Sequence, residues 1–482
     1  MNNILILGAG PAGMSCAFAL AEVKVPSTII EKDSSVGGLA KTLLFNEENY
    51  VFRTDIGPHR FFSKNKKLYD IIESILGEDW VKVKRKTRQF IDGKFYDYPI
   101  NAIQAFKNIG PVRAAKMAIS YSTGAFKFRV LKKPILSFED YIVAYFGKAL
   151  GDFNMLNYTE KIWGIPCNKI HPQWAKQRIK GLNFASAIKN AIIKSENGKP
   201  KSLVDEFYYP RFGTGTIYSG MEKAALRAGS KIIKKSYPTK ITHDGNKITS
   251  VIVNADGKEI KEEPKILVNT IPITDLLNLL SPSPPKHVMD AAKKLQWRNQ
   301  VYLFVTLNKE RITDDNWIYI PNKEIPFARF SEMKNFSKAM SPENKTSAIA
   351  EYFVGEEDRI WRMNEKELFE ESIPWFEKLG FFTRAEVRNY YVVKKQKVYP
   401  VYDLQYQEHL KIIKNYLDSF SNLYYIGRPG RYRYNNQDHS IEMGLLAAEG
   451  ILKESKPDFD SVGAEEEYYE KGEINNEKPS KN

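Results

Sequence analysis

The chain has 482 residues, of which 43% are hydrophobic and 13% aromatic, as expected of a folded, soluble protein with two or three domains. Its two cysteines, Cys16 and Cys167, exclude a disulfide framework and favour a cytoplasmic location. A net charge of +14 permits nucleotides, nucleic acid or an acidic membrane face as partners, although a lysine-rich solvated surface accounts for it equally.

The N-terminal region predicts a strand, a turn, a helix and a second strand. The apolar run 4–7 precedes GAGPAG, and a helix-like stretch then leads to a second apolar run that ends in a glutamate. In such a βαβ unit the glycines permit a tight turn, close approach to a pyrophosphate and close helix packing, while the acid accepts from ribose hydroxyls. The alternative is a glycine turn with a surface glutamate. The residues expected at a dinucleotide are Gly8, Gly10, Pro11, Ala12, Gly13, Glu31 and Lys32.

A pair of glycines follows this acid. The segment 31–42, EKDSSVGGLAKT, resembles the second fingerprint of FAD proteins related to glutathione reductase. The resemblance implies FAD rather than NAD, with Gly37, Gly38 and Leu39 beside the cofactor. A second G-x-G-x-x-G motif does not occur, so a separate NAD(P)H domain is not expected.

The rest of the chain alternates between helical and strand patterns. Helices are expected over much of 100–200, strands with hairpin turns over 231–268, and further strands within 298–355. The stretch 106–133 is basic and amphipathic; it suits a solvated helix face, with contact to an acidic membrane face or a lid as alternatives. From Pro457 the chain is polar and without periodicity, which predicts a disordered tail.

These patterns predict an interleaved α/β fold. It combines an FAD-binding Rossmann-type domain of the glutathione reductase kind, a helical insertion, and a substrate domain with a mixed or antiparallel β-sheet. The expected boundaries are 1–65, 205–285 and 418–456 for the FAD-binding domain, 100–204 for the helical domain, 66–99 and 286–417 for the substrate domain, and 457–482 for the tail.

Four further segments, taken together, resemble UDP-galactopyranose mutases. They are DIGPHRFFSK (55–64), NYTEKIWGIP (157–166), FARFSEMKN (327–335) and YIGRPGRYRYNNQDHS (425–440). The resemblance implies His59, Arg329, Arg428 and Tyr434 as catalytic residues, with the two arginines and the tyrosine as a clamp for a substrate diphosphate. Arginine forks suit phosphate oxygens, but the arginines could instead pair with surface acids.

The same resemblance assigns the remaining site residues. Tyr158 and Trp163 would line the nucleotide-sugar cleft; the alternative is that both are core aromatics. The residues implied to lie beside the flavin are Gly57, His59, Gly427, Arg428, Asn436, Asp438 and Ser440. Metal-ligand spacing is not found among the six histidines, so a metal site is not expected.

The implied reaction interconverts pyranose and furanose forms of a nucleotide-diphosphate sugar, with N5 of reduced FAD attacking the anomeric carbon. NAD(P)H is a candidate reductant. However, Phe62 stands where the mutases usually carry a second histidine, and segments 211–226 and 266–277 resemble protoporphyrinogen oxidases and flavin amine oxidases. An FAD-dependent oxidase or desaturase is therefore the alternative, and a flavin-binding protein without turnover is a third. A nucleic-acid partner is not expected. The oligomeric state stays open, with a homodimer as one option.

Overall fold

The computed structural model describes residues 3–63, 65–98, 107–175 and 206–463. A parallel sheet contains strands from both ends of the chain, in the order β20-β13-β1-β2-β9. Its strands are β1 (Ile4–Leu7), β2 (Thr28–Ile30), β9 (Lys231–Ile233), β13 (Ile266–Asn269) and β20 (Leu423–Tyr425). The βαβ unit predicted from the glycine motif is confirmed, because β1 and β2 pair in parallel around α1 (Pro11–Glu22).

The two faces of the parallel sheet are buried by different layers. Along β1, Ile4 and Ile6 point to a core with helices α1, α2 (Lys66–Leu76), α10 (Gly215–Arg227) and α17 (Gln437–Leu452). Leu5 and Leu7 point to the opposite core. That core contains residues of three strands of the sheet β12-β11-β10-β14, namely β10, β11 and β14, and of helices that include α11, α12 and α15. These elements are β10 (Ser236–His243), β11 (Ile248–Ala255), β12 (Lys258–Glu262), β14 (Leu280–Ser281), α11 (Ile273–Leu279), α12 (Lys286–Lys294) and α15 (Tyr406–Asp418).

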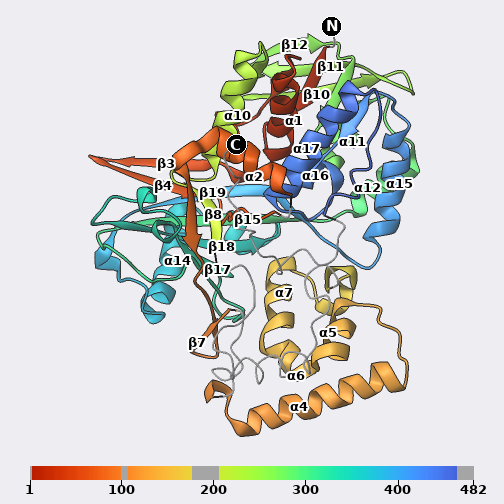
Figure 1. The fold of residues 1–482 in the computed structure, drawn as a ribbon. Coiled ribbons are helices and arrows are strands. Elements are labelled where there is room, and N and C mark those ends of the chain that lie inside the picture. Colours follow the sequence, from red (N-terminus) through yellow and green to blue (C-terminus); the bar gives the residue numbers. More distant parts are fainter. Residues whose placement is uncertain (1–2, 64, 99–106, 176–205, 464–482) are drawn as a thin grey trace, which may run out of the picture.

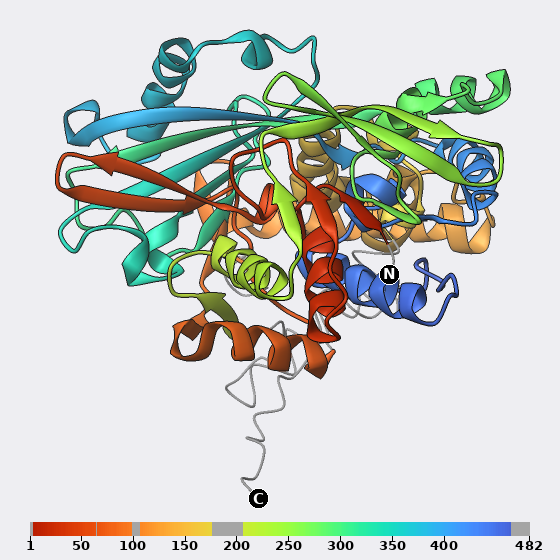
Figure 2. The same ribbon diagram turned by 90° about the horizontal axis from the view of Figure 1, so that it is seen from above.

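A second large sheet is mixed, with the strand order β19-β15-β18-β17-β16-β6-β7 (Figure 2). Its strands are β6 (Thr87–Ile91), β7 (Lys94–Asp97), β15 (Trp297–Leu307), β16 (Trp317–Tyr319), β17 (Arg329–Glu332), β18 (Thr346–Val354) and β19 (Val387–Pro400). Helices α13 (Arg359–Arg362) and α14 (Glu365–Lys378) lie with it, and α14 covers one face. Two ribbons accompany it: β3 (Thr42–Glu47) with β4 (Tyr50–Asp55), and β5 (Trp80–Lys84) with β8 (Glu206–Pro210). The mixed sheet predicted for the substrate side is therefore confirmed.

Helices form the end of the molecule opposite the parallel sheet (Figure 1). They are α4 (Pro111–Ala125), which continues into a π-turn (Phe126–Val130), α5 (Phe138–Phe146), α6 (Lys148–Leu150) and α7 (Leu156–Trp163). The helix α5 begins where the Ser137 side chain accepts from the Asp140 N–H, and it ends at Gly147. The helices expected at 102–109 and 184–195 lie wholly or mostly outside the described residues.

Two helices lie in a different domain from the predicted one. Helix α2 packs into the core of the parallel sheet through Leu68 and Ile72, although the sequence placed it in the substrate domain. Helix α15 likewise packs against that sheet through Ile413 and Leu417. In both cases the apolar face of an amphipathic helix, which the sequence shows, does not reveal which sheet will bury it.

The start of the predicted tail is ordered. Phe459 and Val462 are buried in the core that also contains α1 and α17, and Asp460 forms ion pairs with Lys414 and Arg431. The prediction of a disordered segment from Pro457 is therefore wrong for residues 457–463, because two apolar side chains suffice to anchor them; 464–482 lie outside the described residues. Within the described chain, the helices are all too short or too polar to cross a membrane.

Candidate functional site

The glycine loop after β1 packs too closely for side chains. Gly8 has a φ of +97°, and its N–H donates to the Ile30 carbonyl over 2.8 Å. A Cβ on Gly13 would lie 2.0 Å from the Gly8 carbonyl oxygen. Glycine at these positions therefore allows α1 to begin directly against the edge of the sheet.

Two distant segments meet this loop. The Gly37 N–H donates to the Ala9 carbonyl over 2.8 Å, and a Cβ on Gly38 would lie 3.0 Å from the Gly10 Cα. From the other end of the chain, a Cβ on Gly427 would lie 2.9 Å from the Ala12 Cβ. The glycines predicted at residues 8–13, 37–38 and 427 thus come together.

These residues fit the diphosphate of a dinucleotide. Helix α1 begins with Gly10 as a cap that has no side chain, then Pro11, and its first turn contains no acid. Its N-terminal N–H groups therefore lack a side-chain acceptor from the cap, and the helix dipole favours negative charge there.

Glu31 lies at the end of β2, as predicted, and is buried. Its carboxylate accepts from the Ala9 N–H at 2.7 Å and from the Asp33 N–H at 2.8 Å. Each oxygen keeps a lone pair for a further donor, such as a ribose hydroxyl. Lys32 is exposed beside it, and Leu39 is half-buried.

The second group of predicted residues converges beside the mixed sheet. We call His59, Arg329, Tyr399, Arg428 and Tyr434 the cationic cluster. Its members come from the loop after β4, from β17, from β19 and from the segment after β20, and each is half-buried. Tyr399 was not predicted, because the sequence motif contains only the tyrosines near residue 434.

Arg329 is already paired. Its Nε and NH2 groups donate to the two carboxylate oxygens of Glu351 at 2.5 and 2.6 Å. Glu351 is completely buried, and it also accepts from Gln300 Nε2 at 3.0 Å. The arginine keeps NH1 hydrogens for a further acceptor, but its charge is neutralised by this acid. The prediction considered only acids near in sequence and missed Glu351, which the β17–β18 register places opposite Arg329.

Arg428 differs from Arg329 because its hydrogen-bond partner is neutral. Its Nε donates to the Asn435 carbonyl at 3.0 Å, and its NH2 group donates to the same oxygen. The guanidinium carbon lies 5.0 Å from the ring centroids of both Tyr399 and Tyr434, and these rings stack 5.5 Å apart. Within the described residues no carboxylate lies in ion-pair distance of Arg428, so its positive charge is retained.

The ring of His59 is held by the backbone. Its Nε2 donates to the Ile56 carbonyl over 2.8 Å. Removal from solvent, together with the positive charges of Arg428 and Arg329, lowers the pKa of His59 to about 4. The imidazole is therefore neutral near pH 7.

The tyrosines of the site stay protonated. Burial raises the pKa of Tyr158 and that of Tyr399, so both phenols remain hydrogen-bond donors at neutral pH. Tyr158 packs edge-on against Tyr319, with ring centroids 5.3 Å apart. Electrostatic coupling to Arg329 places Tyr158 beside the cationic cluster.

Trp163 is a core residue. It is 1% exposed and packs against Trp174 at 4.7 Å, Tyr402 at 5.8 Å and, behind the cationic cluster, Tyr399 at 6.4 Å. The prediction that Trp163 lines a substrate cleft is corrected here, because its surface is already covered by these rings. The alternative of a core aromatic holds for it.

Three predicted flavin neighbours lie at the start of α17. Asn436 caps this helix together with His439, whereas Asp438 and Ser440 are buried in the first turn. The Ser440 hydroxyl donates to Asn435 Oδ1 at 3.1 Å, which fixes the residue whose carbonyl holds Arg428. Their role beside a flavin stays a prediction.

A buried carboxylate positions the histidine loop. Asp55 accepts from the hydroxyls of Thr42 at 2.6 Å, Tyr209 at 2.7 Å and Thr214 at 2.7 Å, and burial raises its pKa. The Thr214 hydroxyl also reaches the His59 carbonyl at 3.3 Å. Asp55 thus fixes the segment that begins with Ile56 and carries His59. Gly57, at φ +90°, passes so close to Glu351 that a Cβ would lie 3.1 Å from Oε2.

Acidic, histidine and cysteine side chains do not gather as a metal site anywhere in residues 3–63, 65–98, 107–175 and 206–463. The donors that converge are instead guanidinium, phenol and backbone N–H groups. Such donors suit an anion rather than a cation.

Known proteins share the N-terminal domain and the fold described above. Residues 6–75 match the NAD(P)-binding Rossmann-like domain. The solved structure of reduced UDP-galactopyranose mutase superposes with a TM-score of 0.81 at 21% identity, covering 97% of this chain and 96% of that one. The chain has the fold of UDP-galactopyranose mutase.

Curated relatives include a mutase and a desaturase. A dTDP-fucopyranose mutase of Escherichia coli is 24% identical over 191 residues, which are 38% of this chain and 48% of the relative. A lycopene-forming phytoene desaturase of Pantoea ananas is 23% identical over 286 residues, which are 54% of each chain. The chain thus spans about half the length of these curated relatives. The structural similarity to the mutase covers 97% of this chain, whereas the reaction depends on the residues of the site.

Proposed function

We propose that the protein is an FAD-dependent mutase that interconverts pyranose and furanose forms of a nucleotide-diphosphate sugar. The observation that carries the proposal is Arg428, a half-buried guanidinium beside two stacked tyrosine rings, with no carboxylate partner among the described residues. Its NH1 hydrogens remain available for an anion. A diphosphate is an anion that matches a fixed guanidinium flanked by phenol donors.

FAD suits the converging glycines. The dinucleotide would lie across the start of α1, with its diphosphate against the glycine loop and Glu31 near the ribose. A Cβ on Gly57 would lie 3.7 Å from Arg329 NH2, and the Leu39 backbone is a hydrogen-bond partner of His59. These contacts between the cationic cluster and the glycine segments support a substrate position next to the flavin ring. Reduced FAD, when bound, supplies the nucleophile for the anomeric carbon, and the overall isomerisation is redox-neutral.

The chain's own residues would then hold and orient the substrate. Arg428 binds the diphosphate and keeps the leaving nucleotide in place while the sugar ring rearranges. Arg329 contributes its free NH1 hydrogens without adding net charge, because Glu351 balances it. His59 is neutral, so it adds no positive charge that would compete with the arginines. Tyr158 and Tyr399 offer phenol donors near the same region.

The test uses purified protein with UDP-galactose and other nucleotide sugars, with and without dithionite. A mutase forms the furanose isomer only when the flavin is reduced, and it takes up no oxygen. Oxygen uptake with an apolar substrate, without sugar isomerisation, would contradict the proposal and favour the oxidase or desaturase alternative that the phytoene desaturase similarity raises.

A matched pair of variants tests the anion site. Arg428→Ala should lower the affinity for UDP about tenfold or more, since hydrogen bonds to charged groups contribute roughly 1.5–3 kcal/mol. Arg433→Ala removes the same charge from the same segment, but Arg433 contacts the Asp460 carbonyl at 2.8 Å. It should bind UDP normally. Equal UDP affinity in both variants, with flavin content unchanged, would remove Arg428 from the site.

A further inference from the structure

Helix α4 with its π-turn has one face packed on the protein and one face turned outward. The inner face buries Met117, Gly124 and Phe128. Gly124 lies so close to α5 that a Cβ would come 2.2 Å from the Val143 carbonyl oxygen. The helix is therefore held firmly in one rotation, and the exposure of its other face is fixed by packing.

The outward face carries large apolar side chains that the fold does not cover. Val112 is 72% exposed, Ile119 64%, Phe126 55% and Val130 62%. The first three are seven residues apart, or about two helical turns, so they form one stripe along the helix. Leu131 and Leu136 extend the exposed apolar surface beyond the π-turn.

Positive charge borders this stripe. The segment 107–136 contains seven lysines and arginines and no aspartate or glutamate. Arg113 pairs with Asp92 and Lys133 with Asp140. Lys116, Lys127, Arg129 and Lys132 are exposed, and no acid of the described chain lies within ion-pair distance of them.

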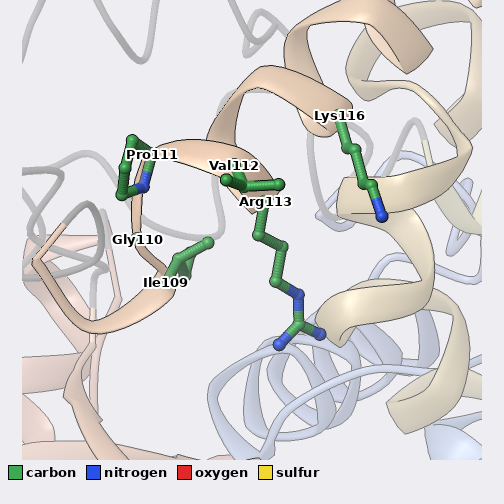
Figure 3. Close-up of a pocket in the computed structure, with 6 residues that line it drawn as sticks. All are labelled: Ile109, Gly110, Pro111, Val112, Arg113 and Lys116. Carbon is green, nitrogen blue, oxygen red and sulfur yellow. The ribbon is translucent and has the colours of Figure 1, made fainter.

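The beginning of the stripe is also the rim of an open hollow of about 460 Å³. Figure 3 shows Ile109 and Val112 there beside Arg113 and Lys116, so apolar and basic side chains share one surface. Figure 1 places α4 at the far end of the molecule from the parallel sheet. A flat partner can therefore reach α4 without contacting the glycine loop.

We propose that the outward face of α4, its π-turn and the segment 131–136 that follows docks on an anionic lipid surface; this face comprises residues 111–136. Aliphatic and phenyl side chains flanked by lysines match the boundary between acyl chains and acidic headgroups. A second copy of the same face would bring its four exposed cations without an acidic partner, Lys116, Lys127, Arg129 and Lys132, against the same four, which opposes self-association. Nucleic acid would satisfy the charges but would leave Ile119 and Phe126 exposed to water. The inference does not depend on the proposed enzymatic function.

The experiment is co-sedimentation of the full chain with vesicles of phosphatidylcholine containing phosphatidylglycerol, and with vesicles of phosphatidylcholine alone. We expect binding to the acidic vesicles only, weakened by added salt. Lys127→Glu with Lys132→Glu should lower vesicle affinity about twentyfold or more, since each basic residue near such a surface contributes several-fold. Lys223→Glu with Lys240→Glu makes the same charge change on α10 and β10 and should leave binding unchanged.

A second pair of variants tests the apolar contribution. Ile119→Ser with Phe126→Ser should release the protein from acidic vesicles even at low salt, whereas Leu226→Ser with Tyr237→Ser, which removes comparably exposed side chains elsewhere, should not. Circular dichroism and thermal melting verify that all variants are folded. The proposal is overturned if the wild type ignores acidic vesicles, or if test and control variants bind alike. It is also overturned if ultracentrifugation shows that Ile119→Ser with Phe126→Ser splits a dimer that does not bind vesicles.

Discussion

Arg329 on β17 and Glu351 on β18 face each other across the mixed sheet and form a two-point ion pair. The acid is fully buried and also accepts from Gln300, whose amide oxygen accepts from the Tyr302 hydroxyl at 2.5 Å. A cation beside the proposed substrate is thus anchored from below by a chain of hydrogen bonds through the sheet.

Glu351→Gln should lower the free energy of unfolding by about 3 kcal/mol, because a buried guanidinium loses its balancing charge. Urea unfolding followed by circular dichroism measures the change. Glu370→Gln is the control: Arg384 and Glu370 form the same two-point geometry at the surface, where solvent screens the pair. If both substitutions have the same small effect, the buried pair does not stabilise the sheet.

Gly38→Ala should reduce the flavin content of the purified protein, because the added Cβ would lie 3.0 Å from the Gly10 Cα and push the two loops apart. The ratio of absorbance at the flavin band to protein absorbance gives the result. Gly77→Ala is matched in φ, since Gly77 has φ +54° and Gly38 has φ +55°, but the surroundings of Gly77 are open. Full flavin content in Gly38→Ala would show that the glycine contact does not shape the cofactor site.

Stability should fall between pH 6.5 and about 4 through His59. The folded-state pKa of His59 is about 4, below the ordinary value of 6.5, so the unfolded chain binds the proton first. His59 therefore does not change the free energy of unfolding above pH 6.5. As the pH falls below 6.5, it lowers the free energy of unfolding by at most about 1.4 kcal/mol per pH unit.

Comparison of urea midpoints at pH 7 and pH 5 checks this expectation. His59→Gln should lose less stability on acidification than the wild type, whereas His287→Gln, at an exposed position, should behave like the wild type. Identical acid sensitivity of His59→Gln and the wild type would mean that the ring is protonated as easily in the folded protein as in the unfolded chain.

Phe459→Ala should lower the free energy of unfolding by about 3 kcal/mol, because Phe459 is buried against the helices of the parallel sheet. Thermal or urea unfolding measures it. Phe126→Ala, which truncates an exposed phenylalanine, should change stability little. If Phe459→Ala leaves the free energy of unfolding unchanged, residues 457–463 do not hold α17 in place.

Local sequence patterns predicted the helices and strands, whereas the pairing of strands within the sheets determines which residues form the site. The motif GAGPAG after an apolar run was enough for β1, α1 and the position of Glu31, because turn and helix there follow from adjacent residues. The strand SAIAEYFV was also predicted, yet its one charge, Glu351, was not connected with Arg329. A lone acid in an apolar strand signals a buried partner, but only the register of β17 and β18 identifies it.

Tyr399 and Asp55 escaped prediction for the same physical reason. Tyr399 lies near the end of β19, outside the sequence motif that contains Arg428, the arginine over its ring, and Asp55 accepts from hydroxyls of three segments. For Trp163 the error is the opposite: the motif predicted a cleft residue, but the side chain is buried in the core behind the site. The separate sequence segments therefore indicate candidate site residues, but only the fold determines which of these residues lie together.

The parallel sheet joins β1 at residues 4–7 with β20 at residues 423–425. During synthesis, the glycine loop leaves the ribosome more than four hundred residues before the strand and helix that complete its surroundings. The surroundings of this loop are therefore complete only when translation has nearly finished, and an incomplete chain exposes an apolar sheet edge to chaperones in the meantime.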